Sequence, residues 1–176
     1  MSLEKIISRL EPLAFHNVPL NTLKELVNPL SCWSELKSPI TEKEVLDCLK
    51  AGKEELVDTP LALEMVFSGK HLDLDKMREN HIKKIAYFVK NESTEPIVID
   101  VGYPSMGTLS SYLIDDGNHR LAGAFIRKDN HIKSRLVGEV EHMKTLGLWS
   151  PNEAYLELEA LYEEQYQERR KNKNKM

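Results

Sequence analysis

The stretch SYLIDDGNHRLAGA, residues 111–124, carries the strongest structural signal in this chain. Its first half predicts a strand over 110–114, which an Asp-Asp-Gly run then interrupts. The alanines and larger apolar residues over 121–126 predict a small-residue helix that can pack closely on a sheet. A strand that leads through glycine directly into a helix is the local plan of an anion-binding site.

The residues at the start of this helix favour phosphate as the anion. The first amides of a helix lack carbonyl partners, and the helix dipole adds positive potential there. Gly117 lets the backbone approach a ligand because it has no Cβ. Arg120 offers a planar positive fork that matches phosphate oxygens, and His119 can donate to the same oxygens or act as an acid or base.

Two adjacent aspartates beside a phosphate site need an explanation, because like charges repel. Asp116 can cap the helix by accepting hydrogen bonds from its amides. Alternatively, Asp115 or Asp116 can hold Mg²⁺, which bridges to phosphate. The sequence favours the capping role for Asp116 and leaves the role of Asp115 open. The alternative for the whole run from Asp115 to Arg120 is a charged helix N-terminus that has no function.

The flanking segments predict an α+β unit over residues 66–142. Residues 66–67 resemble a short strand. Apolar residues at helical spacing over 73–90 predict an amphipathic helix, and the β-branched run over 96–101 predicts a buried strand. A further strand is expected over 132–140.

Outside this unit the chain is predicted to be helical. Residues 1–65 are expected to form an N-terminal helical extension. Within it, Thr41 and Glu44 have the spacing of a capping box, and Gly52 suits the end of the helix that follows. Residues 143–176 are expected to form a C-terminal helix and a basic, solvated tail.

The composition of the 176 residues, 41% hydrophobic and 30% charged, is that of an ordinary globular protein. No stretch approaches the roughly 18 apolar residues of a membrane span, and the N-terminus lacks a signal-peptide pattern, so we expect a cytoplasmic protein without a membrane partner. The net charge of −4 argues against a protein that coats nucleic acid by charge alone. Cys32 and Cys48 match no zinc or redox spacing, so we expect no cysteine chemistry.

The run from Ser111 to Ala124 resembles the motif of the ParB/sulfiredoxin superfamily, in which a strand leads to Asp-Gly-x-(His/Arg)-Arg and a small-residue helix. Within that superfamily it is most similar to ParB-like N-terminal domains of the Asp-Gly-x-His-Arg type. Members include nucleotide-binding partition proteins, ATP-using sulfinic acid reductases, free-serine kinases, and small proteins described as nucleases or ATPases. The resemblance implies a small mixed sheet with packed helices that binds ATP or another nucleotide with Mg²⁺.

By position, the resemblance assigns phosphate binding to the first helical turn and basic contacts to the preceding helix. The candidate ligand-binding residues are Asp116, Gly117, Asn118, His119, Arg120, Arg78 and Lys84. The candidate catalytic residues are Asp115, His119 and Arg120, and Asp115 is also the candidate metal ligand. His81 lies on the apolar stripe of the preceding helix, so we expect it to be a buried core histidine.

Two departures from the family narrow the expected function. Asn118 stands where sulfiredoxin has its catalytic cysteine, so sulfinic reductase activity is not expected. Partition proteins have Glu-Arg-Arg in place of residues 118–120 and add a helix-turn-helix region, so centromere binding is not expected either. The leading function is nucleotide-phosphate binding, with ATP hydrolysis, phosphoryl transfer or nuclease action as its chemistry. The alternative is a non-enzymatic, DNA-associated or protein-interaction module that retains the fold.

Overall fold

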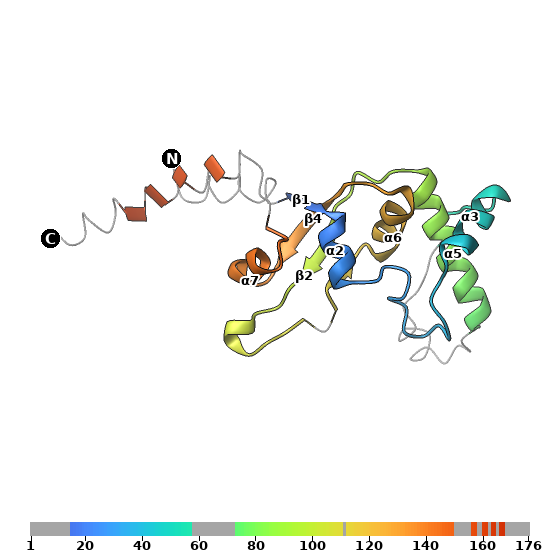
Figure 1. The fold of residues 1–176 in the computed structure, drawn as a ribbon, viewed down its shortest axis with the longest axis horizontal. Helices are drawn as coiled ribbons and strands as arrows, with labels where there is room; N and C mark the ends of the chain where they lie inside the picture. The colour runs from blue at the N-terminus through green and yellow to red at the C-terminus, as the bar shows by residue number, and fades with distance from the viewer. Residues whose placement is uncertain are drawn as a thin grey trace.

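The computed structural model describes residues 15–57, 73–110 and 112–149, and some positions between 156 and 167. This part of the chain has an α+β fold with a small mixed sheet (Figure 1). The strands are β1 (Phe15–Pro19), β2 (Ile97–Asp100), β3 (Ile114–Asp116) and β4 (His131–Val137). The α-helices are α2 (Leu20–Leu26), α3 (Glu42–Lys50), α5 (Leu74–Lys90), α6 (Asn118–Arg127) and α7 (Val140–Thr145), and η1 (Pro104–Met106) is a single 3₁₀ turn.

The sheet has the strand order β1-β4-β2-β3. β2 and β4 run parallel, whereas the two outer strands are antiparallel to their neighbours. α6 therefore carries the chain from the edge strand β3 past β2 to β4, and the connection between the parallel strands β2 and β4 runs through β3 and α6. This connection places the start of α6 at the end of β3, beside the middle of the sheet.

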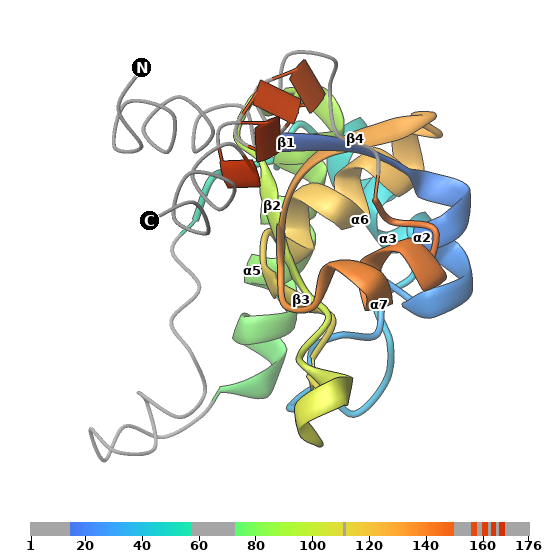
Figure 2. The same cartoon turned by 90° about the vertical axis from the view of Figure 1, so that its left-hand side faces the viewer.

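α6 lies between the sheet and α5 (Figure 1). Its Leu121 belongs to the same buried cluster as Ile97 and Ile99 of β2, while its Ala122 belongs to a second cluster with Ile85 of α5. α2 and α7 lie next to each other and add apolar side chains to the first cluster (Figure 2). The two clusters hold α6 on both sides, which fixes the position of its N-terminus.

Several sequence predictions are confirmed. The helix predicted over 73–90 is α5, which begins after the capping side chain of Asp73. The capping box at the start of α3 is present, since the Thr41 hydroxyl accepts from Glu44 N at 3.3 Å and the Glu44 carboxylate accepts from Thr41 N at 2.8 Å. The buried strand predicted over 96–101 is β2.

Other predictions need correction. The helical prediction for residues 1–65 is wrong at Phe15–Pro19, which forms β1 and pairs with β4. The strand predicted over 110–114 is β3, which starts at Ile114 and includes the two aspartates that we expected to end it. The strand predicted over 132–140 ends at Val137, because Gly138 turns the chain with a φ of 111°.

Two predictions fall largely outside the described residues. The strand expected at 66–67 and the basic tail after 167 both lie there. The described positions between 156 and 167 are helical and exposed. None of the helices in the described ranges has the length and apolar character of a membrane span.

We predict that Gly117→Ala destabilises the fold much more than Gly107→Ala. Both glycines have a positive φ, 93° and 73°, which costs an alanine about 1–2 kcal/mol. A Cβ on Gly117 would lie 2.5 Å from Ile97 Cγ2, whereas a Cβ on Gly107 would meet nothing within 4 Å. The clash should add about 1–3 kcal/mol to the loss in the unfolding free energy. Urea unfolding of both variants measures the difference, and equal losses would contradict the close packing of Gly117 on β2.

Candidate functional site

A β-bulge places both aspartates of the motif on the surface. Asp116 pairs with Val98 and Ile114 pairs with Ile99, so Asp115 is an extra residue that has no partner opposite it in β2. A bulge breaks the alternation of side chains along a strand and redirects the inserted residue. Asp115 and Asp116 are therefore both exposed, although they are neighbours in one strand.

Gly117 ends the strand and starts α6. It is the N-cap residue, and no described side chain caps the helix. The first helical hydrogen bond runs from Leu121 N to Gly117 O at 2.9 Å, so the amides of residues 118–120 precede it. The prediction that Asp116 caps the helix is wrong. A Cβ on Gly117 would lie 2.5 Å from Ile97 Cγ2, so packing against β2 by itself requires glycine at this position.

Arg120 lies under two carboxylates. Its guanidinium donates to Asp116 Oδ2 at 2.7 Å and to Glu95 Oε2 at 2.6 Å. The arginine side chain is 12% exposed, whereas Glu95 and Asp116 are 77% and 70% exposed. Its Nε is buried and has no hydrogen-bond partner in the described structure. Arg120 is thus a nearly buried cation held by two surface anions.

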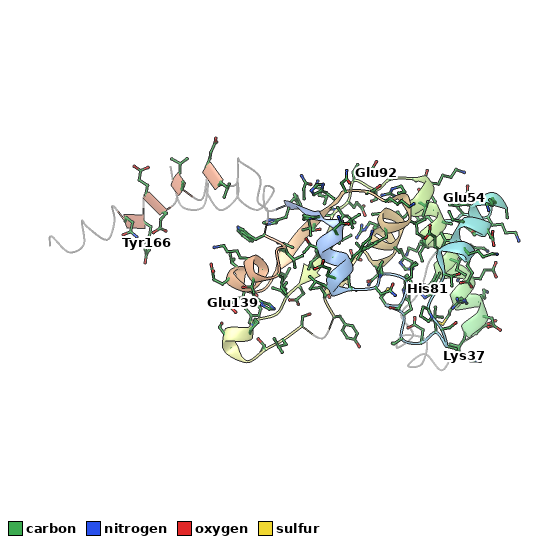
Figure 3. All side chains as sticks on the ribbon, in the orientation of Figure 1. Lys37, Glu54, His81, Glu92, Glu139 and Tyr166 are labelled. Carbon is green, nitrogen blue, oxygen red and sulfur yellow. The ribbon has the colours of Figure 1, made fainter. Side chains whose placement is uncertain are left out.

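A cleft of about 1070 Å³ opens at this point. It is lined by all six residues from Asp115 to Arg120, by Lys84 and His81 of α5, and by the loop between α5 and β2. Two of these lining residues, Glu92 of that loop and His81 of α5, are labelled in Figure 3. The candidate site residues predicted from the sequence therefore line this one cleft, with one exception.

The exception is Arg78. Its guanidinium makes a pair of hydrogen bonds with Glu44, at 3.0 and 2.8 Å, and also donates to the carbonyls of Ser38 and Pro39. Arg78 is not among the residues that line the cleft. The structure gives it a different task, which is to join α5 to the start of α3.

The two histidines of the cleft contact each other directly. His81 Nδ1 lies 2.8 Å from His119 Nε2, and the rings are stacked with centroids 5.1 Å apart. Trp33 packs against both rings, at centroid distances of 4.7 and 5.0 Å. Glu35 Oε1 lies 3.5 Å from His81 Nε2. His81 is buried as expected, yet it is also part of the cleft wall and not only of the core.

Burial keeps both imidazoles neutral. Loss of hydration is the largest of the causes that lower the pKa of His119 to about 3, and electrostatic repulsion from His81, Lys84 and Arg120 supplies the smaller ones. Burial also lowers the pKa of His81, although the nearby Glu35 carboxylate opposes that change. A neutral imidazole has one nitrogen that donates and one that accepts, so the neighbours of each ring decide which nitrogen carries the proton.

Sequence reasoning missed Trp33 and Glu35. They lie in the segment between α2 and α3, far along the chain from both histidines. The segment is anchored by Ile40 N, which donates to Leu30 O at 2.9 Å, and by the packing of Trp33 in the cluster around Ile85. No local pattern marks such residues, because only the tertiary fold brings them to α5.

Cys32 and Cys48 are free thiols. Cys32 lines the cleft, but burial raises its pKa to about 12. The thiol therefore stays protonated at neutral pH and is a poor nucleophile. Within the described ranges no group of three or more His, Cys, Asp or Glu side chains is arranged to hold a metal ion.

Comparison of the chain with protein-family models, with curated proteins and with solved structures finds no match.

We predict that the pH dependence of stability will reveal the buried state of His119. An unfolded histidine has a pKa near 6.5, so below that pH the unfolded chain binds a proton that folded His119 does not bind. Stability should therefore fall as the pH is lowered from 7 to 5, with His119 contributing roughly 2 kcal/mol to the loss. Urea unfolding of the wild type and of His119→Gln at both pH values measures the contribution of His119. An identical pH dependence of the unfolding free energy in the two proteins would contradict the prediction.

Proposed function

We propose that this protein binds the phosphates of a nucleotide, ATP with Mg²⁺, at the start of α6. The observation that carries the proposal is the uncapped N-terminus of α6, which opens into the large cleft. Three consecutive amides and the positive end of the helix dipole face any anion that binds there. Lys84 and Arg120 line the same cleft and add positive charge.

The size of the cleft supports a ligand larger than phosphate. Its volume of about 1070 Å³ lies slightly above the range that small-molecule sites span, roughly 300–1000 Å³. Trp33 and Tyr87 also line it and offer aromatic surface on which a base can pack. These features support a whole nucleotide, with the phosphates at α6 and the nucleoside along the rest of the cleft.

The charge of the cleft favours a nucleotide that arrives with a cation. Among the described residues that line it, carboxylates outnumber basic side chains, and the carboxylates are those of Glu35, Glu92, Glu95, Asp115 and Asp116. A bare polyphosphate would be repelled, whereas Mg²⁺ bound to the phosphates offsets that repulsion. Magnesium usually keeps phosphate oxygens and waters and takes only one or two protein carboxylates. The exposed Asp115 is the residue that we propose for this contact.

Arg120 supports the proposal because its present partners are replaceable. Glu95 and Asp116 place carboxylate oxygens where phosphate oxygens would bind the guanidinium. Both carboxylates are mostly exposed and can move into solvent, whereas the nearly buried Arg120 needs an anionic partner, which a phosphate would supply. A phosphate can therefore displace Glu95 at small cost. Residues 111–124 resemble the ParB/sulfiredoxin motif, which implies phosphate binding by Arg120. We include a ParB/sulfiredoxin fold in this proposal.

We predict opposite effects for two variants of this ion pair. Arg120→Ala should weaken binding of ATP with Mg²⁺ by roughly 10- to 150-fold, because it removes about 1.5–3 kcal/mol of charge-assisted hydrogen bonding. Glu95→Gln should strengthen binding up to about five-fold, because it removes the anion that competes for Arg120. Titration calorimetry measures both affinities.

Glu92→Gln is the matched control for these titrations. Glu92 lines the same cleft three residues earlier and is exposed, and no hydrogen bond joins it to Arg120. Its substitution should change affinity only through the general charge of the cleft. An equal gain in Glu92→Gln and Glu95→Gln would show that the Arg120 contact is not involved. Unchanged ATP affinity in Arg120→Ala would place the anion site elsewhere.

A further inference from the structure

Glu35, His81 and His119 form a continuous row of polar side chains, and all three line the cleft. His81 is the middle member, with Glu35 Oε1 at 3.5 Å from its Nε2 and His119 Nε2 at 2.8 Å from its Nδ1 (His81 is labelled in Figure 3). Trp33 packs against both rings and restricts their rotation. The three residues come from the segment before α3, from α5 and from α6.

The chemistry of these groups fixes where their protons lie. An ionised carboxylate only accepts, so His81 Nε2 must donate to Glu35. A neutral imidazole has a single N–H, so His81 Nδ1 then accepts, and His119 Nε2 must donate to it. His119 Nδ1 is thereby left with its lone pair. Both rings are neutral because they are buried, and because Lys84 and Arg120 also disfavour a proton on His119.

The same geometry argues against a shared metal ion. The two nitrogens of His81 contact different neighbours, so His81 and Glu35 do not direct their ligand atoms to one point with His119. The described residues also contain no group of three possible ligands. A row of this kind is instead the arrangement that orients a catalytic base, in which one group fixes the tautomer of the next.

We propose that His119 is the general base for hydrolysis of a nucleoside triphosphate in the cleft, and that His81 and Glu35 are positioning residues that fix its tautomer. This inference rests on the proposed nucleotide site. A water molecule gives a proton to His119 Nδ1 while its oxygen forms a bond to the γ-phosphorus. The bond from that phosphorus to the bridging oxygen breaks, and its electron pair leaves with the diphosphate.

The row also stabilises the protonated base. When Nδ1 takes the proton, the Nε2 proton of His119 can pass to His81 while the Nε2 proton of His81 passes to Glu35. The proton taken up at His119 thereby neutralises the Glu35 carboxylate, and neither buried imidazole is left with a positive charge. The proton is released to water after the products leave, and the original tautomers return.

Nitrogen NMR of the ligand-free full chain, labelled with ¹⁵N-histidine at pH 7.5, tests the tautomers directly. We expect both His81 and His119 to be protonated at Nε2 and bare at Nδ1. His81→Phe should leave His119 in a mixture of tautomers, whereas His142→Gln, on α7 and outside the cleft lining, should change nothing. Glu35→Gln is the milder variant if His81→Phe fails to fold, and it should lower the pKa of His81. His119 protonated at Nδ1 in the wild type would overturn the proposal.

Release of phosphate from ATP with Mg²⁺ tests the catalytic role. We expect His119→Gln to lower kcat by roughly 10²- to 10⁴-fold, in the range of general-base catalysis, with a change in KM of less than about three-fold. Glu35→Gln should lower kcat by about ten-fold with the same KM, because the base is still present but less well stabilised.

The possible failures are distinct. No calorimetric binding of ATP would overturn the nucleotide site and this inference with it. Binding without hydrolysis, or hydrolysis that is equal in His119→Gln and the wild type, would overturn the inference and leave the nucleotide site standing. Equal losses of kcat in Glu35→Gln and Glu92→Gln would show that Glu35 acts only through the charge of the cleft.

Discussion

The contact of Gly117 with Ile97 is the constraint on which the site depends. The chain turns from β3 into α6 at a φ of 93°, with the backbone against a side chain of the neighbouring strand. This close approach leaves no loop between strand and helix, so the first amides of α6 lie at the end of β3. The buried clusters on both sides of α6 then keep its N-terminus at the cleft. Each candidate residue from Asp115 to Arg120 takes its place from this turn.

Parts of the fold could be predicted because their signals are local. The apolar stripe of α5 and the Thr41–Glu44 capping box are properties of short segments, and the structure has both. β1 was mistaken for helix because five residues that include His16 and Pro19 carry little strand signal of their own. Its conformation comes from pairing with β4, more than a hundred residues later in the chain. Such a long-range partner has no counterpart in the local pattern.

In the site, too, some features could be predicted from local sequence and others depend on long-range contacts. The run from Asp115 to Arg120 is contiguous, so its joint position in one cleft followed from the sequence. The bulge at Asp115 did not, because it depends on the register between β2 and β3. It exposes Asp116 and leaves it to bind Arg120, where a helix cap was expected. Glu35 and Trp33 were missed because only folding brings their segment against His81 and His119.

The central proposal is that a phosphate ligand binds at the amides that begin α6. Backbone amide chemical shifts, followed while ATP with Mg²⁺ is added to the ¹⁵N-labelled protein, test this claim most directly. The account predicts the largest changes at residues 117–120 and at the Arg120 side chain, with smaller changes along the loop that carries Glu95. Shifts that leave residues 117–120 unchanged would contradict it, above all if they gather in the smaller cavity of about 350 Å³ beside Arg127 and Lys133.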